Sequence, residues 1–169
     1  MVTAPTGSGK TVLFELAILQ LFMRPEKGGK KALYLAPTKA LCREKLEEWN
    51  RRFQVLKIKI GLMTGDSQED DIPMIQDNDL IIATPEKWDA VSRRLSGHLG
   101  IVMAIRLVMV DEVHLLHDQS RGHVLEALLC RLKMLGCPAR FVAVSATFPN
   151  IEDVGHWLGG PNAVVFKVN

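Results

Sequence analysis

The sequence has little cysteine and no long apolar run. Its 169 residues include three cysteines: Cys42, Cys130 and Cys137. They form no C-x-x-C pair, and so small a set provides no disulfide framework, which favours a reducing, intracellular compartment. The apolar stretch at residues 12–23 is short and contains Glu15 and Gln20, so it is unable to span a bilayer. These absences argue against a disulfide-stapled secreted domain and against a membrane-spanning protein.

The net charge is also small, and the sequence shows no targeting signal. The formal net charge is +2, which is too small to indicate a polyanionic partner, so any basic surface has to be local. Met1 is followed by neither a basic segment nor a small-residue cleavage site, and we therefore expect no signal peptide. No N-K-x-D motif is present, which argues against a GTPase. With 47% hydrophobic residues, the composition is that of one soluble globular domain.

Short apolar runs alternate with helical patterns along nearly the whole chain. The candidate strands are residues 32–35, 58–63, 80–83, 107–110, 141–144 and 163–168. The candidate helices include residues 11–22, 39–53 and 122–134. Strands that read as continuous hydrophobic runs between helices indicate a mostly parallel sheet with helices on both faces. The predicted class is therefore α/β, and its functional loops should follow the carboxyl ends of the strands.

The stretch "APTGSGKT" at residues 4–11 has the spacing of a phosphate-binding loop. Glycines allow a tight turn in which several backbone N–H groups point at one anion, and the following helix adds its N-terminal dipole. The predicted nucleotide-binding residues are Thr6, Gly7, Ser8, Gly9, Lys10 and Thr11. In this pattern Lys10 reaches the β- and γ-phosphates, and the Thr11 hydroxyl binds Mg²⁺. Ala4 stands where the usual pattern begins with glycine, and the alternative is a Gly/Ser turn before a lysine-capped helix.

The stretch "LVMVDEVH" at residues 107–114 places two acids directly after an apolar strand. Carboxylates are costly at such a position unless a cation lies beside them. Asp111 is positioned to hold Mg²⁺, and Glu112 to polarise the attacking water or take its proton, so Lys10, Asp111 and Glu112 are the predicted catalytic residues. The alternative is a pair of exposed acids that cap the next element. Together, the two stretches predict a nucleoside triphosphate site with Mg²⁺, and the predicted metal ligands are Thr11 and Asp111.

Six motifs in this order resemble those of superfamily 2 helicases. They are "APTGSGKT", "APTKALC" at residues 36–42, "TGD" at 64–66, "TPEKWD" at 84–89, "DEVH" at 111–114 and "SAT" at 145–147. The resemblance covers essentially the whole chain. It implies the first RecA-like P-loop domain of the DExH group, with ATP and Mg²⁺ as cofactors. The chain is most similar to the Ski-type branch, and within it to the meiotic crossover DNA helicases more than to the spliceosomal RNA helicases.

The resemblance also implies roles for individual residues. Those that link the nucleotide state to strand separation are His114, Ser145, Ala146 and Thr147. Those that hold the backbone of a single strand are Pro37, Thr38, Lys39, Arg43, Gly65, Thr84, Pro85 and Lys87. Hydroxyl and N–H groups at helix starts bind phosphate without reading bases, which suits a motor that tolerates any sequence. Thr38 and Thr84 are also good helix-start residues, so simple capping is the alternative at both positions.

The resemblance further implies partners and a compartment that the residues themselves do not specify. The expected ligand is single-stranded or junction nucleic acid, with DNA favoured over RNA, and the expected location is the nucleus, with no membrane association. The chain begins almost at the phosphate loop, and nothing after Asn169 supplies a second RecA-like domain with its arginines. An arginine at the γ-phosphate contributes roughly 10³- to 10⁵-fold to turnover, so the isolated chain should hydrolyse ATP very slowly or not at all. The alternatives are a nucleotide-gated binding or scaffold module without hydrolysis, and an RNA helicase of the same branch.

Several other signals favour packing over chemistry. The three tryptophans and Cys42 lie at helical core spacing or beside apolar neighbours, which favours core positions over base stacking. His114 and His117 lack the cysteine or carboxylate partners of a familiar zinc site. The pair Arg121–Gly122 either faces nucleic acid or only begins a helix, and both interpretations stay open. "LSGHL" at residues 95–99 resembles the signature of transporter ATPases, but "TPEK" and "SAT" argue against that class.

Overall fold

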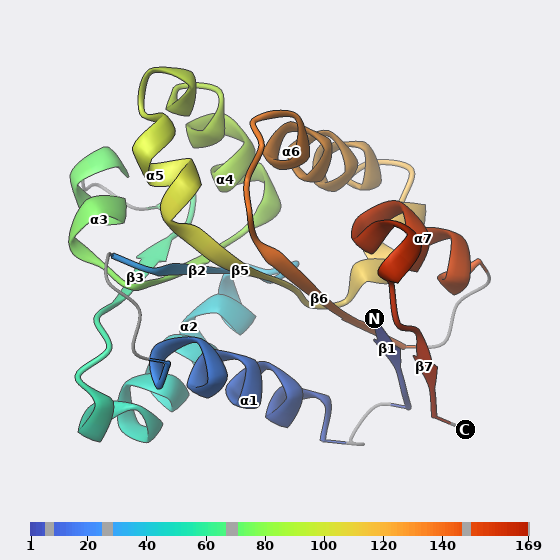
Figure 1. The fold of residues 1–169 in the computed structure, drawn as a ribbon, viewed down its shortest axis with the longest axis horizontal. Helices are drawn as coiled ribbons and strands as arrows, with labels where there is room; N and C mark the ends of the chain where they lie inside the picture. The colour runs from blue at the N-terminus through green and yellow to red at the C-terminus, as the bar shows by residue number, and fades with distance from the viewer. Residues whose placement is uncertain (6–8, 25–28, 67–70, 147–149, 169) are drawn as a thin grey trace.

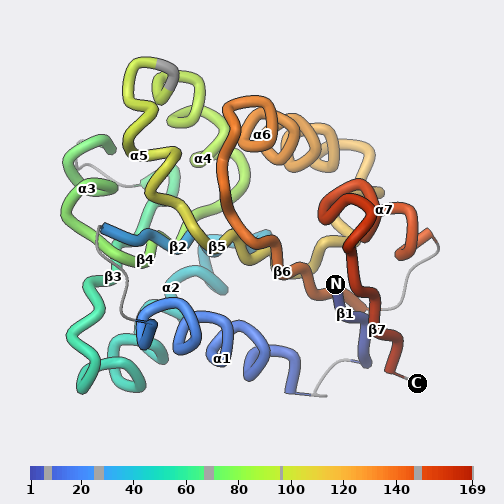
Figure 2. Tube along the Cα trace, viewed as in Figure 1, coloured from blue at the N-terminus to red at the C-terminus, as the bar shows by residue number. Residues whose placement is uncertain are grey.

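The computed structural model describes residues 1–5, 9–24, 29–66, 71–146 and 150–168. Within these residues, seven strands form one sheet in the order β3-β4-β2-β5-β6-β1-β7 (Figures 1 and 2). The strands are β1 (Val2–Thr3), β2 (Lys31–Leu35), β3 (Ile60–Met63), β4 (Leu80–Ala83), β5 (Ile105–Val110), β6 (Arg140–Ser145) and β7 (Phe166–Lys167). Each neighbouring pair is parallel, as the continuous apolar runs predict.

Helices cover both faces of this sheet, which confirms the predicted α/β class (Figure 1). One face carries α1 (Lys10–Phe22) and α2 (Lys39–Arg52), followed by η1 (Gln54–Leu56). The opposite face carries α3 (Asp71–Asp77), α4 (Pro85–Ser92), η2 (Leu95–Gly97), α5 (Leu99–Ala104), α6 (Gly122–Met134) and α7 (Ile151–Gly159). Two short turns, η3 (Val113–His117) and η4 (Gly160–Asn162), complete the described elements. We call the two sides the α1 face and the α6 face.

Alternation along the central strands divides the core between the two faces. In β2, Leu33 and Leu35 belong to the cluster on the α6 face, whereas Ala32 and Tyr34 belong to the cluster on the α1 face. The same alternation runs through β4 and β5. Full burial of an aliphatic or aromatic side chain contributes about 1.5–3 kcal/mol, so both clusters stabilise the sheet from opposite sides.

The packing interpretation of the aromatic and thiol side chains is confirmed. Trp49, Trp88 and Cys42 are fully buried, and Trp157 is partly buried against the α6-face cluster. Trp49 packs edge-on to Tyr34, with 4.8 Å between ring centroids. These side chains stabilise the core and do not form a base-stacking surface.

The predicted helices and strands match the structure closely, with differences at their ends. The strand expected at residues 58–63 begins at Ile60, since Lys57 adopts a left-handed conformation that ends η1. The strand expected at 163–168 is reduced to β7, which pairs with the two-residue β1. The helices α3 and α5 are too short for a clear 3.6-residue period, and sequence reasoning missed them. It also missed α7, although Ile151, Val154 and Leu158 have helical spacing. None of the described helices combines the length and apolarity needed to cross a bilayer.

Candidate functional site

The predicted functional loops meet at one edge of the sheet. All the strands point the same way, so the loops after β1, β2, β4, β5 and β6 lie at the carboxyl ends of their strands. Backbone hydrogen bonds join neighbouring loops there. Asp111 N donates to Leu35 O at 2.9 Å, and Ala4 N donates to Ser145 O at 3.2 Å. Residues widely separated in sequence therefore share a single surface.

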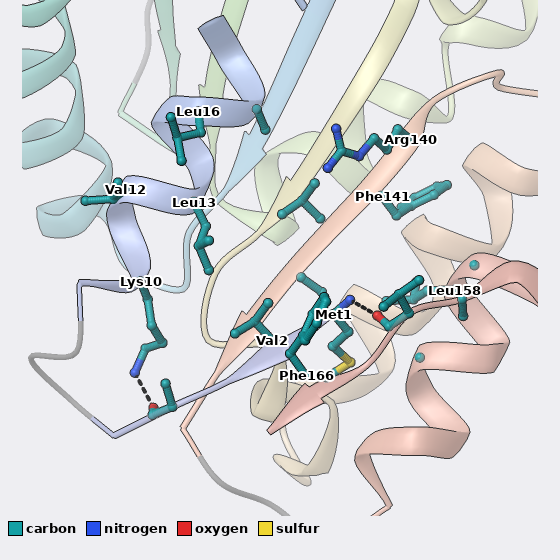
Figure 3. A pocket seen from close by; sticks show the side chains of 18 of the residues that line it. Met1, Val2, Lys10, Val12, Leu13, Leu16, Arg140, Phe141, Leu158 and Phe166 are labelled. Atoms are coloured by element: carbon teal, nitrogen blue, oxygen red, sulfur yellow. Dashed lines mark hydrogen bonds between the residues drawn. The ribbon is translucent and has the colours of Figure 1, made fainter. Parts of the chain in front are cut away.

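The described part of the phosphate loop ends in a helix start. Thr6, Gly7 and Ser8 lie outside the described residues, whereas Gly9 caps α1 in a left-handed conformation with φ of 77°. The positive φ explains the glycine at this position. Lys10 Nζ donates to Ala4 O at 2.7 Å and to Pro5 O at 3.1 Å (Figure 3). The ammonium group of Lys10 thus contacts two carbonyls that follow β1.

Thr11 contacts a lysine that sequence reasoning missed. Lys45 Nζ on α2 donates to Thr11 Oγ1 at 3.4 Å and pairs with Glu48 Oε2 at 2.8 Å. Only 7% of the Lys45 side chain is exposed, so these partners compensate for the burial of its ammonium group. The contact links the helix after the phosphate loop to the helix that begins at the "APTK" motif.

Asp111 is held by the single tyrosine of the chain. Tyr34 Oη donates to Asp111 Oδ2 at 2.7 Å, and the backbone N–H of Glu112 donates to Asp111 Oδ1 at 2.9 Å. Burial, together with the neighbouring Asp111 carboxylate, raises the pKa of Tyr34 far above its usual range. Tyr34 therefore stays protonated and acts as a donor. Its position in β2, the strand beside β5, is a signal that tertiary pairing reveals and sequence alone does not.

Glu112 combines a left-handed backbone conformation with a carboxylate oxygen that lacks a hydrogen bond among the described residues. Its φ is 49°, in the left-handed region that is uncommon for residues other than glycine. Among the described residues, its buried Oε2 accepts no hydrogen bond, although His114 Nδ1 lies 3.2 Å away. This oxygen is available for a further donor, such as a water molecule.

His114 connects the acid pair to the end of β6. Its Nδ1 lies 3.0 Å from Ser145 Oγ, in a hydrogen bond whose direction depends on the tautomer. Ser145 is fully buried, and Ala146 follows it. Thr147 lies outside the described residues. Of the predicted coupling residues, the structure thus brings His114 and Ser145 into direct contact.

Two predicted nucleic-acid residues on α2 share one carboxylate. Lys39 Nζ lies 2.7 Å from Asp66 Oδ1, and Arg43 Nη2 lies 3.3 Å from Asp66 Oδ2. The hydrogen bond from Lys39 lowers the pKa of Asp66 below its usual range, so Asp66 is charged at neutral pH. A Cβ on Gly65 would lie 3.6 Å from Lys39 Nζ, which places the "TGD" loop beside the start of α2.

The two predicted helix-start threonines behave differently. Thr38 Oγ1 accepts a hydrogen bond from Leu41 N at 3.2 Å, so it does cap α2. Thr84 precedes Pro85 at the first position of α4, but its side chain makes no capping bond. The side chain of the buried Thr84 instead interacts with the Glu86 carboxylate.

Lys87 is directed into the protein. Its Nζ lies 2.8 Å from Asp71 Oδ1, and 18% of its side chain is exposed. Asp71 also pairs with Arg94 Nη2 at 2.5 Å. The structure thus brings Lys39, Arg43 and Gly65 together and leaves Lys87 in a separate, largely buried ion pair.

A cavity of about 1250 Å³ adjoins the phosphate-loop helix. Figure 3 shows its lining from α1, β1, β6, β7 and α7, with Lys10 at one end. Most lining side chains are apolar, whereas Asp111 and Glu112 do not line it. The cavity therefore adjoins Lys10, but the acid pair Asp111 and Glu112 lies outside its lining.

Comparison with known proteins finds helicases by both family and individual relatives. A family model described as "DEAD/DEAH box helicase" matches residues 1–154. The ATP-dependent DNA helicase homolog MER3 of Arabidopsis thaliana is 47% identical over 96% of this chain, and the match covers 16% of that protein. The U5 small nuclear ribonucleoprotein 200 kDa helicase of Homo sapiens is 39% identical over 94% of this chain and is covered to 7%. The chain thus spans less than one fifth of the length of these relatives.

A solved structure shares the fold over nearly the whole chain. The Mycobacterium smegmatis helicase Lhr, bound to single-stranded DNA and AMP-PNP, superimposes with a TM-score of 0.77 at 30% identity. The match covers 99% of this chain and 23% of that protein.

Proposed function

Because this chain belongs to the DEAD/DEAH box helicase family, we propose that it is the first RecA-like, ATP-binding domain of a longer ATP-dependent helicase. In the whole protein, hydrolysis of ATP would drive movement along a nucleic-acid strand and its unwinding. The observation that carries this proposal is the position of Tyr34. It packs edge-on against Phe14 of the phosphate-loop helix, with 5.4 Å between centroids, and it donates to Asp111 at 2.7 Å. One side chain thus joins the two halves of the predicted nucleotide site.

The proposed nucleotide site consists of the phosphate loop and the acid pair. Its residues are Thr6, Gly7, Ser8, Gly9, Lys10, Thr11, Asp111 and Glu112. A threonine hydroxyl and an aspartate carboxylate are hard oxygen donors, and this set fits Mg²⁺. When bound, the metal would neutralise charge on the phosphate oxygens. Lys10 would exchange the carbonyls of Ala4 and Pro5 for phosphate oxygens. Glu112 would orient the attacking water and take its proton as the γ-phosphoryl group leaves ADP.

The proposed strand-binding surface consists of the loops after β2, β3 and β4. Its residues are Pro37, Thr38, Lys39, Arg43, Gly65, Thr84, Pro85 and Lys87. Lys39 and Arg43 are more than 45% exposed and accessible to phosphate, although Asp66 competes for them. Lys87 would contribute only after release from Asp71. His114, Ser145, Ala146 and Thr147 would link this surface to the nucleotide.

DNA is the proposed nucleic acid, and the nucleus is the proposed location. Both rest on similarity to the MER3 helicase, which is higher than similarity to the U5 helicase. The proposed contacts are to the sugar-phosphate backbone, and they do not themselves distinguish DNA from RNA. A longer chain with a second RecA-like domain would complete the ATP site, because that domain supplies arginines to the γ-phosphate.

ATPase measurements on the full-length protein test the proposal. We expect ATP hydrolysis to rise on addition of single-stranded DNA. Glu112→Gln should retain ATP binding and lose turnover by about two orders of magnitude or more, because the water loses its base. Lys10→Ala should abolish binding of the triphosphate. A Glu112→Gln protein with normal turnover would refute the assigned role of Glu112. Binding of ATP and DNA without any mutual effect would indicate a scaffold module instead.

The isolated chain provides a second test. We expect ATP turnover close to background and no unwinding, with or without single-stranded DNA. Strong DNA-stimulated turnover by these 169 residues would show that no second domain is needed.

A further inference from the structure

The segment between the acid pair and α6 is held by a compact turn. Asp118 Oδ1 accepts hydrogen bonds from Ser120 N at 2.8 Å, from Ser120 Oγ at 2.6 Å and from Arg121 N at 2.9 Å. These bonds lower the pKa of Asp118 below its usual range, so the carboxylate is charged and accepts all three at neutral pH. Gly122 N donates to Asp118 O at 2.8 Å. The backbone on both sides of Arg121 is therefore fixed to one residue.

Close packing fixes this turn to η3 as well. A Cβ on Gly122 would lie 2.3 Å from Leu116 O and 2.8 Å from the carbonyl carbon of Leu116. Backbone atoms are unable to yield to such a contact, and only glycine fits at this position. At its other end, η3 begins at Val113, and the carbonyl of the preceding Glu112 accepts a hydrogen bond from Leu115 N at 2.9 Å. Glu112, η3 and Arg121 thus form one continuous, tightly bonded segment.

The Arg121 side chain connects this segment to two of the three proposed strand-binding loops, those after β2 and β4. Nη2 donates to Pro37 O at 2.6 Å, and Nε donates to Glu86 Oε1 at 2.7 Å. Pro37 precedes α2, and Glu86 lies in the first turn of α4. The planar guanidinium reaches two acceptors at once, which an ammonium is unable to do in this geometry. One-third of the Arg121 side chain remains exposed.

We propose that Arg121 is a positioning residue that transmits the state of Glu112 to the two strand-binding loops. The inference rests on the proposed helicase function. Movement of η3 in response to the nucleotide would be passed to Pro37 and Glu86 through two short, charge-assisted hydrogen bonds. Conversely, a strand seated on the loops after β2 and β4 would hold η3 and thereby Glu112. Arg121 acts in this way without touching the nucleotide. The guanidinium is bonded to two protein acceptors, which favours positioning over a direct contact with nucleic acid.

Arg121→Lys in the full-length protein is the decisive variant. It keeps the positive charge but is unable to form both contacts, so we expect DNA-stimulated ATPase activity to fall roughly 5- to 100-fold. Basal ATPase activity and ATP affinity should stay within about twofold, because the ATP site itself is unchanged. Hydrogen exchange of the backbone amides of Ala36, Thr38 and residues 86–88 should become faster. Arg51→Ala is the matched control, because Arg51 is an exposed arginine that donates to Glu47 O on its own helix.

Glu86→Ala separates positioning from direct nucleic-acid binding. If Arg121 were a phosphate ligand, removal of Glu86 would free its charge, and less DNA would be needed for half-maximal stimulation. Under the proposal, more DNA is needed and stimulation weakens. Wild-type behaviour of Arg121→Lys, or tighter DNA dependence in Glu86→Ala, would overturn the inference. A wild-type protein without any DNA stimulation would refute the proposed function and, with it, the inference. The two failures are therefore distinguishable.

Discussion

The two faces of the sheet differ in what their buried polar groups reach. The cluster on the α6 face is largely aliphatic, with residues such as Val108 and Leu128, and the largely buried ion pair of Asp89 with Arg131 beside it joins α4 to α6. The cluster on the α1 face is crossed by polar groups, because Trp49 Nε1 donates to Glu15 Oε1 at 3.3 Å and Lys45 pairs with Glu48. Through Tyr34 and Lys45, this polar packing reaches Asp111 and Thr11. The α6 face therefore supports stability, whereas the α1 face also supports the geometry of the proposed ATP site.

Truncation on the α6 face should produce the largest effect, and it should fall on stability. Leu128 is fully buried on α6, and Leu128→Ala leaves a cavity. We expect the free energy of unfolding to fall by about 2–5 kcal/mol, as measured by urea denaturation. The ATPase rate of the folded full-length protein, measured well below its melting temperature, should change less than twofold. A large loss of turnover without a loss of stability would contradict the division between the faces.

Removal of one hydroxyl on the α1 face should lower the ATPase rate and leave stability nearly unchanged. Tyr34→Phe keeps the ring contacts with Phe14 and Trp49 and removes the donor to Asp111. A hydrogen bond to a charged group contributes about 1.5–3 kcal/mol, so we expect kcat to fall roughly tenfold as the carboxylate loses its orientation. ATP affinity should be unchanged, and the melting temperature should shift little. Titration of kcat against Mg²⁺ concentration checks whether the loss lies at Asp111.

A smaller effect is expected where the α1 face meets the proposed strand-binding surface. Asp66→Asn removes the carboxylate that neutralises Lys39 and Arg43. Single-stranded DNA should then bind roughly threefold more tightly at low salt, and the difference should shrink as salt rises, since these charges are exposed. Fluorescence anisotropy at two salt concentrations measures both. Weaker binding would show instead that Asp66 orients the two cations for phosphate.

The smallest effect concerns a thiol in the α1-face core. Burial raises the pKa of Cys42 to about 11. The folded pKa lies above the unfolded value of about 8.5, so the protonated thiol adds stability below that pH, which is lost as the pH rises toward 11. At pH 8, alkylation of Cys42 should be much slower than that of the partly exposed Cys130, as followed by mass spectrometry. Equal rates in the folded protein would contradict the burial, whereas equal rates in urea are expected.

Local patterns were sufficient to predict most of the fold. The strands β2, β4, β5 and β6 and the helices α1, α2 and α6 have apolar periods that the sequence displays. The short α3 and α5 lack such a period, and tertiary contacts stabilise their one or two turns. The helix α7 has one, in Ile151, Val154 and Leu158, and was missed. The extent of β7 depends on its pairing with β1, from the opposite end of the chain.

The motifs indicated the candidate site but not its contacts. Lys10 and Asp111 were predicted from the residues around them, and His114 from the resemblance to superfamily 2 helicases. Their roles in hydrolysis and coupling stay predictions. Tyr34 and Lys45 were missed because neither belongs to a motif, and their partners lie 77 and 34 positions away in the sequence. The ion pair of Lys87 with Asp71 was missed for the same reason. Sequence spacing reports which residue types occur together along the chain, whereas partner choice depends on strand order.

The strand order also bears on how the sheet forms. The strand β1 pairs with Val144 and Ser145 of β6 and with Phe166 and Lys167 of β7. Met1 N donates to Val164 O at 2.6 Å, a contact across 163 positions of the sequence. Such long-range pairings form late because they carry the largest loop-closure cost. The segment before the predicted phosphate loop should thus be seated only after β6 and β7 are in place.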